Sequence, residues 1–322
     1  MALRIIEEGL QTSIQDTGRY GFQSAGFSVS GAMDIWSAAL ANIAVNNDPS
    51  QAVLEMSYVG PSITFEADTV IALAGADMAA KINGKPIQLG KPVSVKNADT
   101  LQLRTARRGL HCYLAVKGGF NIPDFLGSKS ASLKDQLGGS FCGKLQAGDT
   151  IPISFSTKAP SVSWRLSPKL FDYISGKQTT IRFLEGRQYH WFTRHSLSDF
   201  TSTVYTSTPQ SNRMGYRLQG TPLKVQTEGD LVTEAAGFGT IQVPPDGQPI
   251  ILMAESQPTG GYPKIGQVIH SDLPALSQIR PGQPIVFQMT TVDNALQEWE
   301  NTIRQLAMVK RISDKKWEEW ET

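Results

Sequence analysis

The chain of 322 residues is poor in cysteine and histidine and has no excess of charge of either sign. Its two cysteines, Cys112 and Cys142, are too few for a disulfide framework or a four-thiolate zinc site. Such a pair is typical of a reducing cytosol, where both are usually small buried hydrophobic side chains. With 30 Lys and Arg against 29 Asp and Glu, the chain also lacks the basic excess that nucleic acid or an anionic membrane requires.

Long hydrophobic runs are absent as well. No stretch reaches 18 consecutive apolar residues, so we expect no membrane-spanning segment. The N-terminus has one basic residue, Arg4, and the acidic pair Glu7-Glu8 where a secretion signal needs an apolar run. We therefore expect a cytoplasmic protein.

The common catalytic motifs are missing too. The sequence has no Gly-Lys-Ser/Thr phosphate loop, no dinucleotide fingerprint, no Gly-x-Ser-x-Gly elbow and no His-Glu-x-x-His. His190 and His195 are five residues apart, which is the wrong step for one face of a helix, so we predict no metal site. A site for a charged substrate would have to use arginine, aspartate and backbone groups.

What is present indicates a mainly β protein. At 40% hydrophobic and 18% charged residues, the chain can bury a sizeable core, and its length suggests two domains. Short apolar runs bounded by Gly, Pro and Asn predict strands at intervals of roughly ten residues. The expected strands are 63–67, 70–74, 93–95, 101–104, 113–116, 151–155, 180–184, 203–205, 223–225, 240–243, 250–253 and 285–287. Asn83-Gly84 predicts a tight hairpin, because both central positions of a type I′ turn need positive φ.

A Ser-rich linker at 160–168 predicts an N-terminal β domain over 1–160 and a C-terminal β domain over 161–291, followed by a helical tail over 292–322. A second helix is expected over 32–45, with Ser30 as its cap. In the tail, an apolar stripe predicts a helix from Asp293 to about Ile312 that packs on its own domain. The stripe consists of Val292, Leu296, Trp299, Ile303 and Leu306. Two tryptophans after Ser313 suggest a further short docked helix.

The first segment dense in charged groups and glycines runs from Gln15 to Asp34. In one interpretation, Asp16, Arg19 and Asp34 polarise and orient a substrate, while glycines such as Gly31 allow its close approach. In the other, Asp16 caps a turn and pairs with Arg19, and Asp34 serves the N-terminus of the following helix.

Two later segments offer anion-binding chemistry. Around Asn212 and Gly215, Arg213 and Arg217 are four residues apart, so on one strand they could clamp a carboxylate or phosphate; the alternative is a pair of surface arginines. In 257–263, two adjacent glycines after a threonine could form an anion-binding nest, although a turn between strands would leave the same trace.

Taken in order, these motifs resemble one family. They are Gln-Asp-x-Gly-Arg-x-Gly, Ser-Gly-Ala-Met-Asp, Tyr-Leu-Ala-Val-x-Gly-Gly, Asn-Arg-Met-Gly-Tyr-Arg-Leu-x-Gly, Gln-Val-Pro-x-x-Gly-Gln-Pro-Ile and Thr-Gly-Gly-Tyr-Pro. Between Gly9 and about Phe287 the chain is similar to the KipA / allophanate hydrolase subunit 2 family, which includes the C-type subunits of 5-oxoprolinases and is carboxyltransferase-like. The resemblance implies two tandem cyclophilin-like β-barrel domains with a few short helices and a C-terminal helix.

The resemblance also implies an activity. It is that of one component in a complex that hydrolyses 5-oxo-L-proline to L-glutamate using ATP, in which ATP phosphorylates the lactam oxygen. The implied partners are two further components of the complex, a KipI-like protein and a LamB/YcsF-like protein. ATP, with Mg²⁺, is the implied cofactor, bound on this chain or at a site shared with a partner.

Carried onto this sequence, the motifs mark a set of site residues to which we assign roles from their chemistry. The catalytic candidates are Asp16, Arg19, Asp34 and Arg213. The substrate- or nucleotide-binding candidates are Gln15, Gly31, Asn212, Gly215, Arg217, Gln257, Thr259, Gly260, Gly261 and Tyr262. The chain departs from the family pattern at Asn46, Glu255 and Pro258, and Pro258 removes one N–H group from the expected nest.

Two other functions stay open. Relatives form the carboxyltransferase part of urea amidolyases, which use biotin. Because this chain has no Met-Lys-Met carrier motif, biotin would arrive on another protein. The third possibility is a non-catalytic KipA-like antagonist of a KipI-like kinase inhibitor.

Overall fold

The computed structural model describes residues 1–154, 164–174, 177–226 and 231–321. The chain forms two compact units, each described here by itself. Unit 1 consists of Met1–Arg19, Ser30–Ile174 and Ile303–Thr322, and unit 2 of Tyr20–Val29 and Ser175–Thr302. Residues 161–174 thus belong to the first unit, and the tail is shared between both. The expected linker at 160–168 lies partly outside the described residues.

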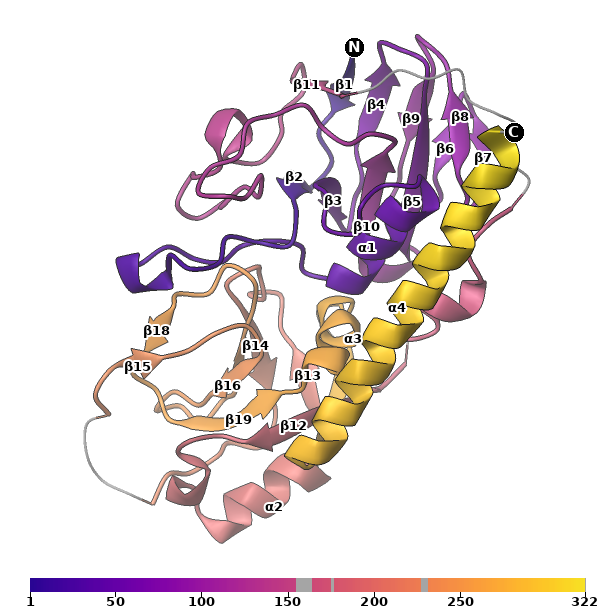
Figure 1. The fold of residues 1–322 in the computed structure, drawn as a ribbon. Coiled ribbons are helices and arrows are strands. Elements are labelled where there is room, and N and C mark those ends of the chain that lie inside the picture. The colour runs from indigo at the N-terminus through magenta and orange to yellow at the C-terminus, as the bar shows by residue number, and fades with distance from the viewer. Residues whose placement is uncertain (155–163, 175–176, 227–230, 322) are drawn as a thin grey trace. The chain divides into compact units, whose positions relative to one another are not determined.

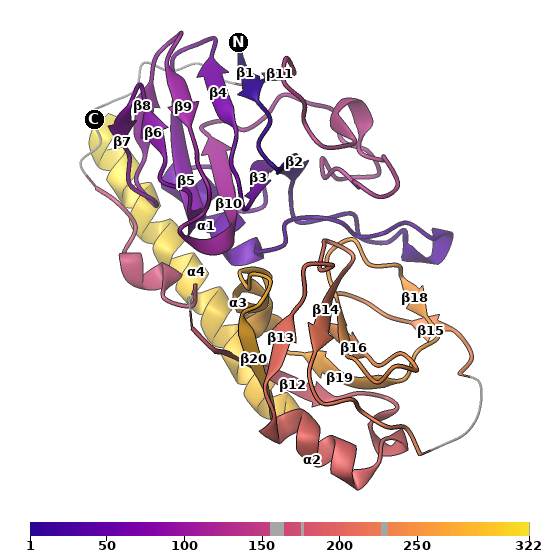
Figure 2. The same cartoon turned by 180° about the vertical axis from the view of Figure 1, so that it is seen from behind.

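Unit 1 contains two antiparallel sheets (Figures 1 and 2). One has the strand order β11-β1-β4-β9-β6-β7 and the other the order β2-β3-β10-β5-β8. The strands are β1 Ala2–Glu7, β2 Gln11–Gln15, β3 Val53–Ser57, β4 Ser62–Phe65, β5 Thr69–Asp77, β6 Lys81–Ile82, β7 Lys85–Pro86, β8 Val93–Val95, β9 Thr100–Gln102, β10 Arg108–Val116 and β11 Thr150–Pro152. The expected hairpin is confirmed, since Asn83 (φ 50°) and Gly84 (φ 81°) join β6 to β7.

The alternation of side chains along each strand divides unit 1 into two cores. Leu54 and Met56 of β3 join Leu3, Ile63 and other apolar residues of both sheets in the larger core. Val53, on the opposite face of β3, belongs to a second core that contains most of α1 (Ile35–Ala44). One face of the sheet β2-β3-β10-β5-β8 therefore contributes to the core that contains α1.

The helix at 32–45 is confirmed, but its expected cap is wrong. Asp34, not Ser30, caps α1, because its Oδ1 accepts a hydrogen bond from the Ser37 N–H at 2.9 Å. Ser30 instead has a left-handed backbone, with φ 58°. Two 3₁₀ turns, Gly139–Phe141 and Pro168–Phe171, complete the short helices of unit 1 among the described residues.

Unit 2 is built on a closed barrel with the strand order β12-β19-β16-β17-β14-β13-β20. Its strands are β12 Thr179–Glu185, β13 Tyr205–Ser207, β14 Gly215–Gln219, β16 Thr240–Gln242, β17 Ile250–Leu252, β19 Lys264–Val268 and β20 Pro284–Met289, and a separate ribbon pairs β15 Glu234–Ala235 with β18 Thr259–Gly260. The helices are α2 Arg194–Ser202 and α3 Leu273–Ser277, with 3₁₀ turns at Gln23–Ala25, Tyr189–Trp191 and His270–Asp272. An aromatic cluster that includes Phe183, Phe200 and Phe287 packs inside this unit.

The expected fold class is thus confirmed as mainly β with a C-terminal helix, and unit 2 is a closed barrel. Unit 1, in contrast, arranges its described strands in two sheets. The expected strand at 223–225 is wrong, because Val225 forms only an isolated bridge to Phe192. Within the described residues, no helix is long and apolar enough to cross a bilayer.

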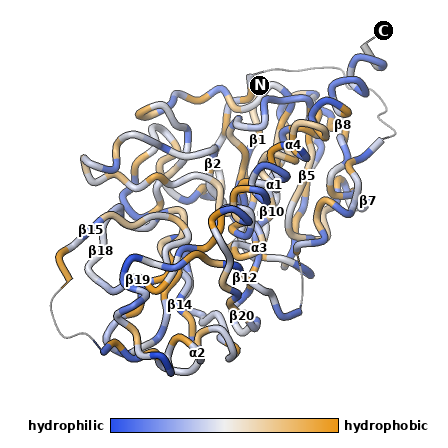
Figure 3. Tube along the Cα trace, turned by 60° about the horizontal axis from the view of Figure 1, so that its bottom comes forward, coloured by the Kyte–Doolittle hydropathy of each residue, from blue (hydrophilic) through white to orange (hydrophobic). Residues whose placement is uncertain are grey.

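The tail is one continuous helix, α4 (Val292–Glu321), rather than two. Its packing differs from the expected stripe, since Val292, Leu296 and Ile303 are each about half exposed, at 59%, 56% and 49%. Contacts with the core of α1 are made by residues nearer the C-terminus. Trp317 is buried and donates its indole N–H to the Ala44 carbonyl at 3.2 Å. The exposed faces of the last turns are hydrophilic (Figure 3).

Candidate functional site

One face of β2, β3 and β10 in unit 1 carries polar side chains although it is buried. The register places Ser13 opposite Glu55, Glu55 opposite Tyr113, and Ser57 opposite His111. Each of these side chains is at most 7% exposed. Burying polar groups costs free energy unless they are hydrogen-bonded, so such a row in a sheet of apolar neighbours indicates a functional site.

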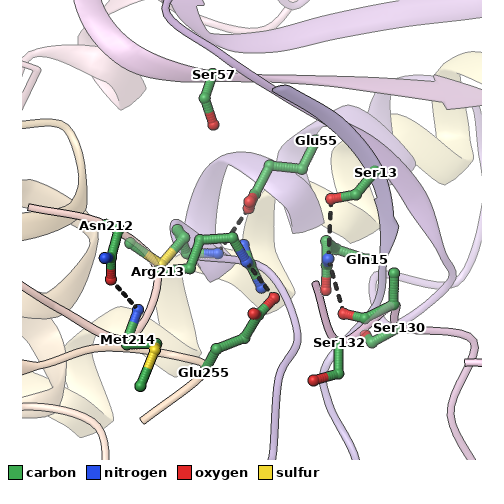
Figure 4. A network of polar contacts seen from close by, with 12 residues as sticks. Ser13, Gln15, Glu55, Ser57, Ser130, Ser132, Asn212, Arg213, Met214 and Glu255 are labelled. Carbon is green, nitrogen blue, oxygen red and sulfur yellow. Dashed lines mark hydrogen bonds and ion pairs between the residues drawn. The ribbon is translucent and has the colours of Figure 1, made fainter. Parts of the chain in front are cut away.

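Glu55 lies at the centre of this row (Figure 4). Its Oε2 accepts hydrogen bonds from the Met33 N–H and the Tyr113 hydroxyl, both at 2.7 Å. His111 places Nδ1 2.9 Å from the Ser57 hydroxyl and 4.0 Å from Glu55 Oε1. Burial, and then the neighbouring Glu55 carboxylate, hold the pKa of Tyr113 well above its usual range, so Tyr113 remains a neutral donor.

Asp34 connects this network to α1. Its backbone N–H donates to the Tyr113 hydroxyl at 2.7 Å, and its Oδ2 accepts from the Tyr173 hydroxyl at 2.6 Å. Burial, followed by the charge of Asp34, also raises the pKa of Tyr173 well above the ordinary value. The interpretation of Asp34 as the carboxylate of a helix N-terminus is confirmed, whereas its catalytic role stays a prediction.

Asp16 and Arg19 hold the loop 125–131 against the end of β2. Asp16 accepts hydrogen bonds from the Gly18 N–H at 2.8 Å, the Ser128 hydroxyl at 2.7 Å and the Lys129 N–H at 2.6 Å. It therefore caps a turn, as the second interpretation of this segment predicts.

Arg19 is only 1% exposed and donates to two carbonyls of the same loop. Its Nε lies 3.0 Å from the Phe125 oxygen and its Nη2 lies 2.9 Å from the Ser130 oxygen. Burial lowers its pKa, and Asp16 partly offsets that effect. No direct Asp16–Arg19 ion pair occurs among the described contacts, so the expected local pairing is wrong.

Gly31 packs against the turn that Asp16 caps. Its φ of 88° is unfavourable for other residues, and a Cβ atom would lie 2.9 Å from the Gly18 nitrogen. The backbone of this glycine thus approaches another segment of the chain. Asp16, Gly18, Arg19 and Gly31 form one local structure, as their shared motif predicts.

Gln15 is fully buried at the end of β2. Its Nε2 donates to the Ser13 hydroxyl at 2.9 Å and to the Ala131 carbonyl at 3.1 Å (Figure 4). Its Oε1 is buried and has no hydrogen-bond partner among the described residues.

In unit 2, Arg213 forms a buried ion pair with Glu255 (Figure 4). The Arg213 Nε and Glu255 Oε1 atoms are 2.6 Å apart, and the two side chains are 4% and 2% exposed. Asn212 shapes the preceding turn, because its Oδ1 accepts from the Met214 N–H at 2.8 Å. The departure at Glu255 from the family's more common aspartate therefore lies at the partner of a motif arginine.

The expected clamp of two arginines on one strand is wrong. β14 begins at Gly215, so Arg213 lies in the turn before it and Arg217 lies within it. Arg213 is buried, whereas Arg217 is exposed at a hollow of about 280 Å³ that is also lined by Thr208, Gln210, Asp246 and Gln248. The two guanidinium groups thus occupy different environments, and a binding role for Arg217 stays a prediction.

The segment 257–262 does not form the expected nest. Thr259 and Gly260 are an extended strand, β18, paired with β15, and neither Gly260 nor Gly261 has positive φ. Gly260 is required for close packing, since its Cβ would lie 2.2 Å from Gln242 Nε2. Gln257 and Tyr262 are exposed beside it.

Sequence reasoning missed Glu55, Tyr113, His111 and Glu255. The available signal was the run Val53-Leu-Glu-Met-Ser57, in which one charged residue interrupts an apolar strand. The described residues contain no group of three or more His, Cys, Asp or Glu side chains that could hold a metal ion.

Comparison with known proteins identifies the family of this fold. Residues 25–289 match the family model described as carboxyltransferase domain, subdomain A and B. The chain is 37% identical to the C-type component of the 5-oxoprolinase of Escherichia coli (strain K12), over 95% of this chain and 97% of that protein. It is also 31% identical to the urea amidolyase of Lachancea kluyveri, over 89% of this chain but only 17% of that longer protein.

A solved structure agrees with this family. The crystal structure of the K. lactis urea amidolyase matches 96% of this chain with a TM-score of 0.89 at 27% identity, although the match spans only 20% of that chain. Because the family model covers most of the sequence and the bacterial relative matches from end to end, the chain belongs to the carboxyltransferase subdomain A and B family, together with that 5-oxoprolinase component.

Proposed function

We propose that this chain is the C-type component of a cytoplasmic complex that hydrolyses 5-oxo-L-proline to L-glutamate at the expense of ATP. Its partners in this proposal are a KipI-like protein and a LamB/YcsF-like protein. The observation that carries the proposal is the match over 97% of a protein that is itself named as part of a 5-oxoprolinase. Urea amidolyase, in contrast, is matched over only 17% of its length.

The polar row in unit 1 supports a binding role for this chain. Glu55 and Tyr113 form a buried pair with fixed donors and acceptors, and the Met33 and Asp34 N–H groups complete their hydrogen bonds. Such a preorganised network can orient a small polar substrate without reorganising during the reaction. The role suggested for these residues is to position the lactam and its carboxylate rather than to attack the ring.

The described residues do not support an ATP site on this chain alone. The segment expected to cradle phosphates is a paired strand, and Arg213 is already paired with Glu255. ATP, with Mg²⁺, is therefore assigned in this proposal to the partner proteins or to a site completed by them.

The test is reconstitution. The chain is purified alone, in each pair and in the three-component assembly, and ATP-dependent release of glutamate from 5-oxo-L-proline is measured. We expect turnover only from the complete assembly. No glutamate release from a stable complete assembly would refute the proposed function, and robust turnover by the chain alone would refute its dependence on partners.

A second candidate is a carboxyltransferase that uses biotin on another protein. The family model and the urea amidolyase structure favour it. In this case the chain, mixed with a biotinylated carrier and its carboxylase, would support bicarbonate-dependent carboxylation of urea. The same preparations assayed for both reactions separate the two candidates.

A further inference from the structure

The starting observation is an unsatisfied buried acceptor. Gln15 is 0% exposed, and its Oε1 has no hydrogen-bond donor among the described residues. A buried polar atom left without a partner costs roughly 1–3 kcal/mol, so native proteins rarely retain one without a reason. Its place beside Ser13 and in the same sheet as Glu55 suggests that the missing donor belongs to a ligand.

The surroundings determine which end of the amide is the acceptor. The group that faces the Ala131 carbonyl at 3.1 Å must be the donor, because a carbonyl accepts only. If the amide were turned over, Oε1 would meet that carbonyl oxygen and the hydrogen bond would be lost. The assignment of Oε1 as the open acceptor therefore follows from the hydrogen-bond network.

Ser13 supplies a donor on the same side of β2. Residues two apart in a strand point to the same face, and the Ser13 Oγ accepts a hydrogen bond from Gln15 Nε2 at 2.9 Å. The hydroxyl still has its own hydrogen to donate, and no acceptor for it occurs in the described part of the chain. Ser13 and Gln15 thus present one donor and one acceptor side by side.

We propose that Ser13 and Gln15 bind the edge of a five-membered cyclic amide. In such a ring the N–H and C=O groups point outward on the same side, so the N–H can donate to Gln15 Oε1 while the carbonyl accepts from the Ser13 hydroxyl. This inference rests on the proposed function, for which the ligand is the lactam ring of 5-oxoproline. The ureido ring of biotin has the same edge and would be the ligand under the carboxyltransferase alternative.

The arrangement makes a specific prediction about ligand chemistry. Replacing the ring N–H by oxygen, as in the corresponding lactone, would place two acceptors against each other in a buried site. Sites built to bond a buried N–H reject analogues that lack it more strongly than they reject analogues of altered size. Because Gln15 is enclosed, ligand entry requires neighbouring side chains to move.

The experiment compares 5-oxo-L-proline with its lactone analogue, and biotin as a third probe. Binding is measured by titration calorimetry on the full chain and on the three-component assembly. The variants are Gln15→Met and Ser13→Ala. The matched control is Thr12→Val, which lies on the same strand but faces the other way and bonds the Glu8 carbonyl. Melting temperatures confirm that each variant is folded.

We expect the wild type to bind the lactam at least about tenfold more tightly than the lactone. Gln15→Met should reduce that preference to less than about threefold, Ser13→Ala should weaken the lactam by about threefold to tenfold, and Thr12→Val should change neither. A loss of preference specific to Gln15→Met cannot come from a general loss of stability.

Equal binding of lactam and lactone by the wild type would overturn the inference, even if Gln15→Met fails to fold. So would an undiminished preference in folded Gln15→Met, or no binding of any probe to either preparation. If the wild-type assembly releases glutamate while Gln15→Met behaves like the wild type, the proposed function stands and this inference fails. Binding of biotin alone, with the same dependence on Gln15, would support the edge-recognition site and refute the 5-oxoproline function.

Discussion

Replacing Arg213 by alanine tests the buried ion pair of unit 2 directly. The Arg213 and Glu255 side chains are 4% and 2% exposed and meet at 2.6 Å. Removing the arginine leaves the carboxylate buried without this partner, which typically costs about 3–5 kcal/mol. For a unit of this size each kcal/mol corresponds to about 3 °C in melting temperature, so we expect a loss of about 9–15 °C.

Two further variants separate the charge from the packing. The double variant Arg213→Met with Glu255→Leu replaces both ions by apolar groups of similar volume, and should recover most of the lost stability. Arg213→Lys should be intermediate, because the observed contact is made by Nε and lysine lacks the planar guanidinium group.

The assay is thermal and denaturant unfolding of the full chain, followed by two spectroscopic probes because the chain has two compact units. A loss of less than about 2 °C for Arg213→Ala, or a double variant as unstable as the single one, would refute this reasoning. In the assembled complex below the melting transition, Arg213→Ala should also lower turnover by about tenfold. Wild-type turnover of a folded variant would remove Arg213 from the functional site.

Three other predictions concern unit 1. Trp317→Ala should destabilise the chain by about 3–5 kcal/mol, because the buried ring packs beside α1 and under the Lys117 ammonium, while the half-exposed control Ile312→Ala should cost less than about 0.5 kcal/mol in the same melting assay. Iodoacetamide followed by mass spectrometry should label Cys142 in the native chain and Cys112 only after unfolding, since burial raises the thiol pKa of Cys112; native labelling of Cys112 would contradict its placement. Because the pKa values of Tyr113 and Tyr173 are raised in the folded state, their contribution is present below the unfolded pKa of about 10 and is lost as the pH rises above it. Stability should therefore fall above about pH 10 and fall less in Tyr113→Phe, and tyrosinate absorbance from both groups at moderate alkalinity in the native chain would refute this assignment.

The fold class could be predicted because its signals are local. Asn83-Gly84 marks a hairpin by the positive φ of two adjacent positions, and Asp34 marks a helix start by one hydrogen bond three residues ahead. The errors arose where local signals were weak or misleading. The stripe through Leu296 has helical spacing, but spacing cannot tell which stretch of a 30-residue helix meets a core.

The candidate site was predicted in part. The motif around Gln15, Asp16 and Arg19 does form one local structure, because a turn and its cap are neighbours in sequence. The role of Arg213 was misjudged for the opposite reason. Its partner Glu255 is 42 residues further along the chain, and an isolated arginine looks the same in sequence whether it is a free clamp or half of a buried pair.

By itself, the sequence determined a mainly β chain with a C-terminal helix, because alternation, turn residues and caps act over a few positions. Only the tertiary structure decided that Ser13, Glu55 and Tyr113 lie side by side, since strand register depends on which strands pair. Likewise, the open acceptor on Gln15 exists only because Ala131, more than a hundred residues away, engages the other end of the amide. Burial and hydrogen-bond partners are properties of the assembled core, and they determine which of the polar residues in the motifs remain available to a ligand.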